Sequence, residues 1–339
     1  MSNYWKGKNV FITGINGFIG GNLAKALLDK GAVITGLVRN RDKNTFLFFE
    51  DIADRITLIQ GELVDREILE GIIVEQQIDV VFHFAAQVEV GVGIKNPYLT
   101  FETNIRGTYC LMEAIRNSGQ NVQSIVVAST DKSYGSYPKE SMPYKEDYPL
   151  KPEYPYDISK ACADMIAQSY ASDIYRLPVV VTRFCNIYGP GQLNFSAVIP
   201  DGIRSALGYT KFIPRGDGTQ IRDFIYVEDV TDLYMLIGEL LGNDPDKLTG
   251  EIFNAGTNTA HSVREVLEAI YSQVGKSSDL ENILSLMRDK KTSGEIDIQF
   301  MDFEKVNKFT GWKPKHSFEQ GLKKTIDWYV KYLREKNEF

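Results

Sequence analysis

The stretch NVFITGINGFIG, residues 9–20, decides how the rest of the sequence is read. Residues 9–13 form a short apolar, β-branched run, and glycines then lead into an apolar repeat at helical spacing over 18–30. In a turn between strand and helix, glycines let the backbone approach a pyrophosphate, and the helix N-terminus supplies N–H donors. We therefore expect this turn to hold a dinucleotide, through Gly14, Asn16, Gly17, Phe18, Ile19 and Gly20.

The same alternation of strand and helix continues to about residue 184. Strands that are apolar on both faces and alternate with helices indicate a parallel sheet covered on both sides. We therefore predict an α/β fold with a Rossmann-like, doubly wound parallel sheet. The expected strands are 9–13, 32–38, 56–60, 79–85, 124–129 and 178–184, and the expected helices after the first are 66–76, 98–118 and 156–174.

After about residue 185 the elements become shorter and richer in Gly and Pro, which predicts a smaller, mixed second lobe. A polar stretch at 275–295 interrupts it, and an amphipathic helix is expected over about 317–334. Within this part, DFIYVEDV (223–230) and EIFNAG (251–256) are interpreted as a strand and a helix start that return to the sheet. The predicted division is therefore 1–183 plus about 222–257 for the dinucleotide domain, and about 184–221 plus 258–339 for the nucleotide-sugar lobe.

Charge and composition exclude several classes of protein. The chain has 38 basic and 45 acidic residues, a net charge of −7, and no Lys/Arg block that could follow a nucleic-acid backbone. Three widely spaced cysteines and three histidines argue against a disulfide framework or a metal site. No run approaches the ~18 apolar residues of a membrane span, and the N-terminus lacks a secretory signal, so we expect a cytoplasmic protein without nucleic-acid or membrane partners.

The end of the second predicted strand bears on the choice of cofactor. An acidic residue there binds the ribose 2′-hydroxyl of NAD, whereas arginine accommodates the 2′-phosphate of NADP. The segment GLVRNRDK has Arg39 and Arg41 at this place, with Asp42 close behind. We therefore expect NAD(P)⁺ and favour NADP⁺, with NAD⁺ left open by Asp42.

A tyrosine and a lysine four residues apart suggest a catalytic pair. The segment YDISK places Tyr156 and Lys160 on one helix face, where an ammonium can stabilise a phenolate. Such spacing arises readily by chance, and two other pairs of this kind occur in the chain. Only Tyr156 opens a helix after a strand of the predicted sheet, beside the C-terminal strand ends where ligands bind in this fold.

Several motifs in order now identify a family. The chain carries TGINGFIG, HFAAQ (83–87), TNIRGT (103–108), ASTDKSYG (128–135), YDISK, RFCNIYGPGQ (183–192) and RDFIYVEDV (222–230). In this order they resemble the extended short-chain dehydrogenases/reductases that act on nucleotide sugars. The resemblance covers nearly the whole chain.

The segment Thr130-Asp131-Lys132 indicates a branch of that family. Sugar epimerases usually continue here with small or apolar residues, whereas nucleotide-sugar 4,6-dehydratases carry an acid and a base. The Asp-Lys pair, WKGKNVFITG (5–14) and VIPDGI (198–203) resemble CDP-glucose enzymes, but RDFIYVEDV resembles dTDP-glucose and GDP-mannose enzymes. The resemblance therefore implies a 4,6-dehydratase and leaves its nucleotide and hexose open.

This resemblance implies a mechanism. Tyr156, assisted by Lys160, would take the C4 hydroxyl proton while hydride leaves C4, and Thr130 would hydrogen-bond O4. Lys132 would then remove the C5 proton, and Asp131 would protonate O6 as water departs. Because hydride returns to C6, the net reaction is that of a lyase. The alternatives are a C4 epimerase or C4 oxidase of the same fold, and a non-catalytic dinucleotide-sensing protein.

The resemblance also implies binding residues and an assembly. Further cofactor-binding residues are Arg39, Asp65, Ala85, Ala86, Gln87 and Asn104. Substrate-binding residues are Gln87, Ser129, Asn186, Ile199, Arg215 and Arg222. Family members commonly form dimers through two long helices, which implies a homodimer through 98–118 and 156–174.

Overall fold

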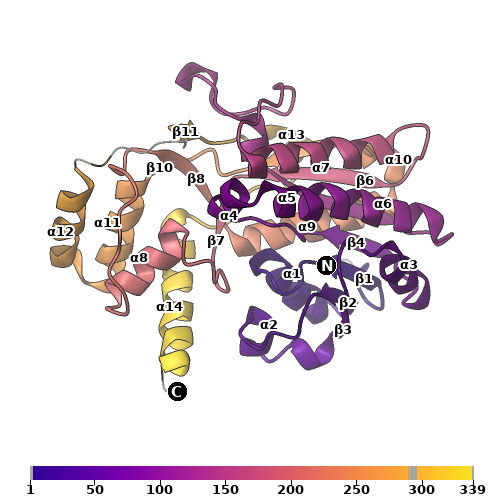
Figure 1. Ribbon diagram of the computed structural model, residues 1–339, viewed down its shortest axis with the longest axis horizontal. Helices are drawn as coiled ribbons and strands as arrows, with labels where there is room; N and C mark the ends of the chain where they lie inside the picture. Colours follow the sequence, from indigo (N-terminus) through magenta and orange to yellow (C-terminus); the bar gives the residue numbers. More distant parts are fainter. Residues whose placement is uncertain (1–2, 289, 291–295, 338–339) are drawn as a thin grey trace.

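A seven-stranded parallel sheet forms the centre of the larger lobe (Figure 1). The computed structural model describes residues 3–288, 290 and 296–337. Within them the sheet has the order β3 (Thr57–Gln60), β2 (Val33–Val38), β1 (Asn9–Thr13), β4 (Val80–His83), β5 (Ser124–Thr130), β6 (Val179–Phe184) and β9 (Ile252–Ala255). All neighbouring strands run parallel. The predicted doubly wound α/β fold is confirmed.

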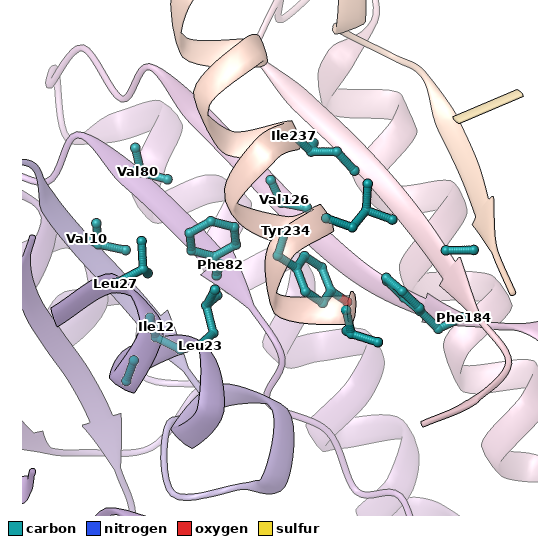
Figure 2. Packing of buried hydrophobic residues seen from close by; sticks show 14 of the residues in the cluster. Val10, Ile12, Leu23, Leu27, Val80, Phe82, Val126, Phe184, Tyr234 and Ile237 are labelled. Atoms are coloured by element: carbon teal, nitrogen blue, oxygen red, sulfur yellow. The ribbon is translucent and has the colours of Figure 1, made fainter. Parts of the chain in front are cut away.

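Both faces of this sheet are covered, which explains why its strands are apolar throughout. On one face lie α1 (Phe18–Asp29) and α9 (Val227–Asn243), which pack against each other. On the other lie α3 (Arg66–Glu75), α6 (Gly107–Asn117) and α7 (Pro155–Ala171). Because side chains alternate across a strand, Val10 and Ile12 enter the first core and Phe11 enters the second. Figure 2 shows the first core, with Leu23, Phe82, Val126 and Tyr234 among its members.

The helix expected over 98–118 is divided by a wider turn. It consists of α5 (Pro97–Phe101), a π-helical turn (Glu102–Arg106) and α6, and α4 (Val90–Lys95) precedes it. The π turn contains Asn104, which is 2% exposed. Such turns often occur at functional sites, because they reorient one side chain within a continuous helix.

The second lobe contains a small mixed sheet in which β8 (Ile221–Tyr226) pairs with β7 (Asn186–Tyr188), β10 (Ala260–Ser262) and β11 (Ile298–Gln299). Beside it lie α8 (Val198–Ala206), α11 (Val263–Val274), α12 (Ser277–Met287) and α14 (Phe318–Asn337) (Figure 1). The remaining elements are α2 (Phe46–Phe49), α10 (Pro245–Leu248), α13 (Glu304–Thr310) and 3-10 turns at Ala53–Arg55, Asp131–Tyr134 and Lys139–Ser141.

Two sequence-based expectations about this lobe need correction. The strand expected at 223–226 forms, but it belongs to the small sheet, and the chain returns to the large sheet through α9 and β9. An apolar strand pattern reveals burial but not the partner strand, so the pattern could not distinguish the two sheets. The stretch 275–295 also contains α12, which buries Leu280, Ile283 and Met287 on one face. Residues 289 and 291–295 of that stretch lie outside the described residues.

None of the helices in the described ranges is both long enough and apolar enough to cross a membrane.

Candidate active site

A cavity of about 1330 Å³ lies between the C-terminal ends of the large-sheet strands and the second lobe. This exceeds the usual volume of a site for one small ligand, about 300–1,000 Å³, so two ligands can lie together. Most of the expected site residues line it. They are Gly14, Asn16, Gly17, Phe18, Ile19, Gly20, Arg39, Ala85, Ala86, Ser129, Thr130, Asp131, Lys132, Tyr156, Asn186, Ile199, Arg215 and Arg222.

The turn after β1 has the shape that a pyrophosphate requires. Gly14 has φ +73°, and a Cβ there would lie 2.7 Å from the Ala85 nitrogen. A Cβ at Gly20 would lie 2.4 Å from the Gly14 oxygen, so α1 could not begin so close to the turn with a larger residue. The Asn16 Oδ1 is buried and has no hydrogen-bond partner among the described residues. The glycine cradle at a helix N-terminus fits the pyrophosphate of a dinucleotide, whose oxygens accept from N–H groups, and the Asn16 Oδ1 is left to accept from a hydroxyl or N–H group.

The end of β2 presents both signs of charge to the cavity. Arg39 and Asp42 are exposed and line it, whereas Arg41 donates a 3.4 Å hydrogen bond to the Leu58 carbonyl oxygen. Asp65 does not line the cavity. Its carboxylate caps α3 by accepting from the Ile68 N–H at 3.2 Å.

Asn104 and Gln87 also lie outside the cavity lining and connect the segments around it. The Asn104 amide accepts from the Gln87 N–H at 2.7 Å and donates to the Gln87 carbonyl oxygen at 3.0 Å. It also donates to the Ser159 Oγ at 2.8 Å. The π turn thereby links the chain after β4 to the helix that bears Tyr156, and so positions the wall of the site.

The acid and the base of the predicted pair stand together where β5 ends. The Thr130 hydroxyl donates to the Asp131 Oδ1 at 3.1 Å and accepts from the Lys132 N–H at 3.4 Å. Asp131 is 4% exposed, and its Oδ2 has no partner among the described residues. Burial raises the pKa of Asp131, although the charges of Lys132 and Arg222 oppose the rise. Asp131 is therefore suited to carry a proton that it can donate.

Tyr156 and Lys160 occupy the first turns of α7. Burial raises the pKa of Tyr156, as do the charges of Asp131 and Asp157, and a hydrogen bond with the Thr130 side chain opposes the rise. Burial also lowers the pKa of Lys160 to about 8, and the Lys160 Nζ donates to the Ala128 carbonyl oxygen at 2.6 Å. We expected Lys160 to favour the phenolate, but burial and the charges of two carboxylates act on Tyr156 in the opposite direction. Tyr156 needs further positive charge to act as a base at neutral pH.

Asp157 is a cavity residue that the sequence analysis did not single out. It is 4% exposed and lines the cavity beside Tyr156. Burial raises its pKa to about 6, while the charge of Lys132 lowers it and that of Asp131 raises it. An acidic residue in the first turn of a helix is usually a capping group, so the sequence contained no signal beyond its proximity to Tyr156.

The second lobe contributes groups suited to phosphate and nucleotide. Asn186 lies on β7, where its amide donates to the Asp223 carbonyl oxygen at 3.4 Å. Arg222 on β8 is 8% exposed and donates to the Ile221 carbonyl oxygen at 2.9 Å. Ile199 is buried at the start of α8, and Arg215 is exposed. An amide and guanidinium groups facing one cavity can bind a diphosphate.

The buried histidine of β4 belongs to the core. Its two ring nitrogens hydrogen-bond Thr13 at 2.7 Å and Thr108 at 2.9 Å. Burial, and then the charge of Lys160, lower the pKa of His83 to about 3. His83 is therefore neutral at physiological pH.

The chain is similar to known proteins over nearly its whole length. A profile described as GDP-mannose 4,6 dehydratase matches residues 11–325. The human protein dTDP-D-glucose 4,6-dehydratase is 33% identical over 334 residues, which cover 95% of this chain and 90% of the human one.

Two solved structures show the same fold. The dTDP-glucose 4,6-dehydratase of Bacillus anthracis, solved in complex with NAD, has a TM-score of 0.81 and 31% identity, covering 96% of this chain and 97% of that one. The UDP-glucose 4-epimerase of Thermotoga maritima, solved with UDP-glucose, has a TM-score of 0.82 and 27% identity, covering 96% and 99%. The extent of these matches and the acid-base pair after β5 lead to one conclusion: the chain belongs to the GDP-mannose 4,6 dehydratase family, within the extended short-chain dehydrogenases/reductases that dehydrate nucleotide sugars.

Proposed function

We propose that the protein converts a nucleoside-diphosphate hexose into the 4-keto-6-deoxyhexose and water, with Asp131 and Lys132 performing the elimination. The observation that carries this proposal is the joint position of these two residues beside Tyr156 in one cavity. A simple C4 oxidase needs a base for the hydroxyl proton but has no use for a second acid and base. A dehydratase needs both.

The first step uses Tyr156. When bound, a nicotinamide dinucleotide supplies the hydride acceptor for C4 and the hydride donor for C6. Tyr156 would remove the C4 hydroxyl proton while Thr130 hydrogen-bonds O4. Lys160 would favour the phenolate, because its ammonium lies on the same face of α7.

The second step uses the pair after β5. A ketone at C4 acidifies the C5–H bond, so that Lys132 can serve as the base that removes that proton. Asp131, whose pKa is raised by burial, would protonate O6 so that it leaves as water. The unpartnered Oδ2 of Asp131 is the oxygen available to the substrate.

Binding of the substrate is assigned to the second lobe. We propose that Asn186 and Arg222 hold the diphosphate, because both are held by main-chain contacts at the cavity wall. Ser129 would lie toward the hexose, and Ile199 and Arg215 toward the nucleoside. Gln87, which we expected to bind substrate, does not line the cavity and would act by positioning the chain after β4. This assignment corresponds to the proposed division into a dinucleotide domain and a nucleotide-sugar lobe, with β8 now assigned to the lobe.

Within the nicotinamide cofactors we propose a preference for NADP⁺, which rests on Arg39. On the cofactor side, Gly14 to Gly20, Ala85 and Ala86 would contact the dinucleotide directly. Asn104 would act by positioning the neighbouring segment, and Asp65 by capping α3. We also propose that the enzyme works in the cytoplasm, where nucleotide sugars and this cofactor are available.

A homodimer is proposed on separate grounds. Ile94, Tyr98, Tyr109 and Met165 are 60%, 72%, 40% and 54% exposed on α4, α5, α6 and α7, the region in which the family forms dimers. Large exposed apolar side chains gathered on adjacent helices indicate a contact surface. Light scattering on the wild type should give twice the chain mass, and Tyr98→Lys should give the single-chain mass.

A 4-epimerase is the second candidate, because the Thermotoga maritima epimerase shares the fold. A non-catalytic dinucleotide sensor fits less well, since it would not need the groups at Tyr156, Asp131 and Lys132. Incubation with CDP-, dTDP-, GDP- and UDP-hexoses, followed by mass spectrometry, separates the three. Loss of one water supports the dehydratase and identifies its nucleotide. A new sugar of unchanged mass would indicate the epimerase, and no turnover of any substrate would contradict both enzymes.

A further inference from the structure

The two lobes contact each other beside one end of the cavity, where β2 is followed by α2. There α14 of the second lobe runs beside α2 (Figure 1). In a Rossmann-type fold the end of the second strand faces the adenosine ribose of the dinucleotide. Asn44 and Thr45, which directly precede α2, line the cavity at this end together with Arg39. The contacts that hold α2 therefore bear on how the adenosine half of the cofactor is bound.

Aromatic rings of α14 pack on aromatic rings of α2. The ring centroid of Trp328 lies 5.2 Å from that of Phe49 and 6.2 Å from that of Phe46. Phe49 also lies 5.1 Å from Tyr332, which stacks on Trp328 at 4.9 Å. Ring pairs at these separations attract one another beyond the effect of the area that they bury. The four rings therefore dock α2 on α14.

Glu50 adds a polar contact at the C-terminal end of α2. Its Oε1 accepts from the Trp328 indole N–H at 2.8 Å, and its Oε2 accepts from the Lys25 ammonium at 2.5 Å. Although burial acts to raise the pKa of Glu50, these hydrogen bonds hold it below its usual value. The ionised carboxylate thus connects α1, α2 and α14.

The other end of α2 is held between the lobes by Phe46, which is 2% exposed. A Cβ at Gly21 of α1 would lie 3.0 Å from the Phe46 Cδ1, and a Cβ at Gly191 would lie 2.4 Å from its Cδ2. Gly191 belongs to the loop that follows β7 and also lines the cavity. The position of α2 is therefore set by groups of both lobes.

Thr45 carries a hydroxyl that a ligand in the cavity can use. The residue is 7% exposed, and its Oγ1 is buried without a hydrogen-bond partner among the described residues. Its side chain makes no capping hydrogen bond to α2. A buried hydroxyl without a partner is unfavourable until a ligand supplies one. At this end of the cavity, the hydroxyls of the adenosine ribose are groups that can supply it.

We propose that Trp328 is a positioning residue for the cofactor, because it holds α2 where the Thr45 hydroxyl can meet the adenosine ribose. Trp328 itself does not line the cavity. It acts through α2, as groups behind a binding residue do when they fix its orientation. The lobe to which we assign the nucleotide sugar therefore also takes part in binding the dinucleotide.

The first test is calorimetric titration with NAD⁺ and with NADP⁺, in the absence of sugar nucleotide. Trp328→Leu removes the ring and its N–H, and should raise the dissociation constant of the tighter-binding cofactor by about 10-fold. Trp328→Phe keeps a ring and loses only the bond to Glu50, so its value should lie between those of Trp328→Leu and the wild type. An unchanged dissociation constant in Trp328→Leu would overturn the proposal.

Trp312→Phe is the matched control for these variants. It also removes an indole N–H, which donates to the Asp229 carbonyl oxygen at 3.2 Å, and Trp312 does not line the cavity. Its dissociation constants for both cofactors should equal those of the wild type. A loss as large as that in Trp328→Leu would show a general effect of removing a tryptophan, and would contradict the proposal.

A double-mutant cycle separates positioning from a purely structural role. Thr45→Val removes the hydroxyl and should weaken cofactor binding, whereas Thr45→Ser retains the hydroxyl and should bind as the wild type does. In the Thr45→Val background, Trp328→Leu should have a much smaller effect than in the wild type, because no hydroxyl remains to be positioned. If Trp328→Leu does not fold, Trp328→Phe completes the same cycle. Equal effects in the two backgrounds would refute the proposal. Because these titrations contain no sugar nucleotide, their result is separate from that of the dehydration assay.

Discussion

The Lys160 ammonium donates a 2.6 Å hydrogen bond to the carbonyl oxygen of Ala128, and this contact ties the first turns of α7 to the end of β5. The tyrosine of α7 and the acid-base pair after β5 are held together in part by this bond. Asn104 adds a second tie through Ser159. The site is thus assembled by contacts between β5 and α7, which residues 131–154 separate in sequence.

Replacement of Lys160 should change the pH profile in a defined direction. Burial lowers the pKa of Lys160 to about 8, so the wild type loses the ammonium as pH rises through that value, and kcat/KM should decline on the alkaline side. Lys160→Arg keeps its charge at any working pH, so its residual activity should show no decline near pH 8. Lys160→Met should lose about 10²-fold in kcat at neutral pH. An unchanged alkaline limb in Lys160→Arg would contradict this role.

Lys132→Met should separate oxidation from elimination. With substrate, the variant should still produce the reduced nicotinamide absorbance, because Tyr156 and Lys160 are intact. It should release no 4-keto-6-deoxy product, because nothing removes the C5 proton. Rapid-mixing absorbance and mass spectrometry measure the two events. If the variant bound cofactor and substrate normally but never reduced the cofactor, the division of roles would be wrong.

Asp131→Asn should lower the pKa of Tyr156. The Asp131 charge is one of the groups that raise it, and asparagine removes that charge at nearly constant volume. We expect the Tyr156 tyrosinate to form at a lower pH in Asp131→Asn than in the wild type. Ultraviolet titration of tyrosinate measures it, with Tyr156→Phe in the same background to identify the signal among 18 tyrosines. No difference between the titrations would mean that the two groups are not coupled.

Arg39→Ala should weaken NADP⁺ binding more than NAD⁺ binding. A guanidinium on the 2′-phosphate contributes about 1.5–3 kcal/mol, so the ratio of dissociation constants should change by about 10- to 100-fold. Arg41→Ala is the matched control, because Arg41 is engaged with the Leu58 carbonyl oxygen and does not line the cavity. Calorimetric titration with both cofactors decides the question. Equal losses for NAD⁺ and NADP⁺ would remove the basis for an NADP⁺ preference.

The buried ion pair between Arg183 and Asp164 should be important for stability. The two side chains are 3% and 0% exposed and lie 2.8 Å apart, and Arg183 also donates to Tyr134. Asp164→Asn or Arg183→Met should reduce the free energy of unfolding by about 3–5 kcal/mol, since each leaves an unpaired buried group. Arg106→Met breaks the more exposed pair with Glu102 and should change it by less than about 1 kcal/mol. Urea unfolding measures these effects, and similar values for both pairs would contradict the argument.

Most of the fold was predictable because its pattern is local. Three features can be recognised from residues that are close in sequence. They are the apolar runs of strands buried on both faces, the glycine at position 14, where φ is positive, and the helical spacing of apolar residues on one helix face. The placement of β8 was not predictable, because Phe224, Ile225 and Tyr226 would be equally suitable in either sheet. The π turn at Asn104 also left no signal, since its residues continue an ordinary helical pattern.

The candidate site was predictable where a motif combines several residue types. Thr130, Asp131, Lys132 and Tyr156 line the cavity as expected. Asp157 was missed because an acid near a helix start is ordinary. Asp65 was predicted to bind cofactor, but its carboxylate caps the N-terminus of α3. Only the folded structure shows this hydrogen bond.

By itself, the sequence determined the class of fold, the family and the identities of the reacting groups, because these depend on spacing along the chain and on side-chain chemistry. The tertiary structure decided the direction in which the pKa of each reacting group is shifted, and which segments of the chain are joined by hydrogen bonds at the site. Burial raises the pKa values of Asp131 and Tyr156 and lowers that of Lys160, and no local pattern reports burial. The hydrogen bond from Lys160 to the Ala128 carbonyl oxygen likewise depends on how α7 docks against β5, because a hydrogen bond requires two groups to meet in space.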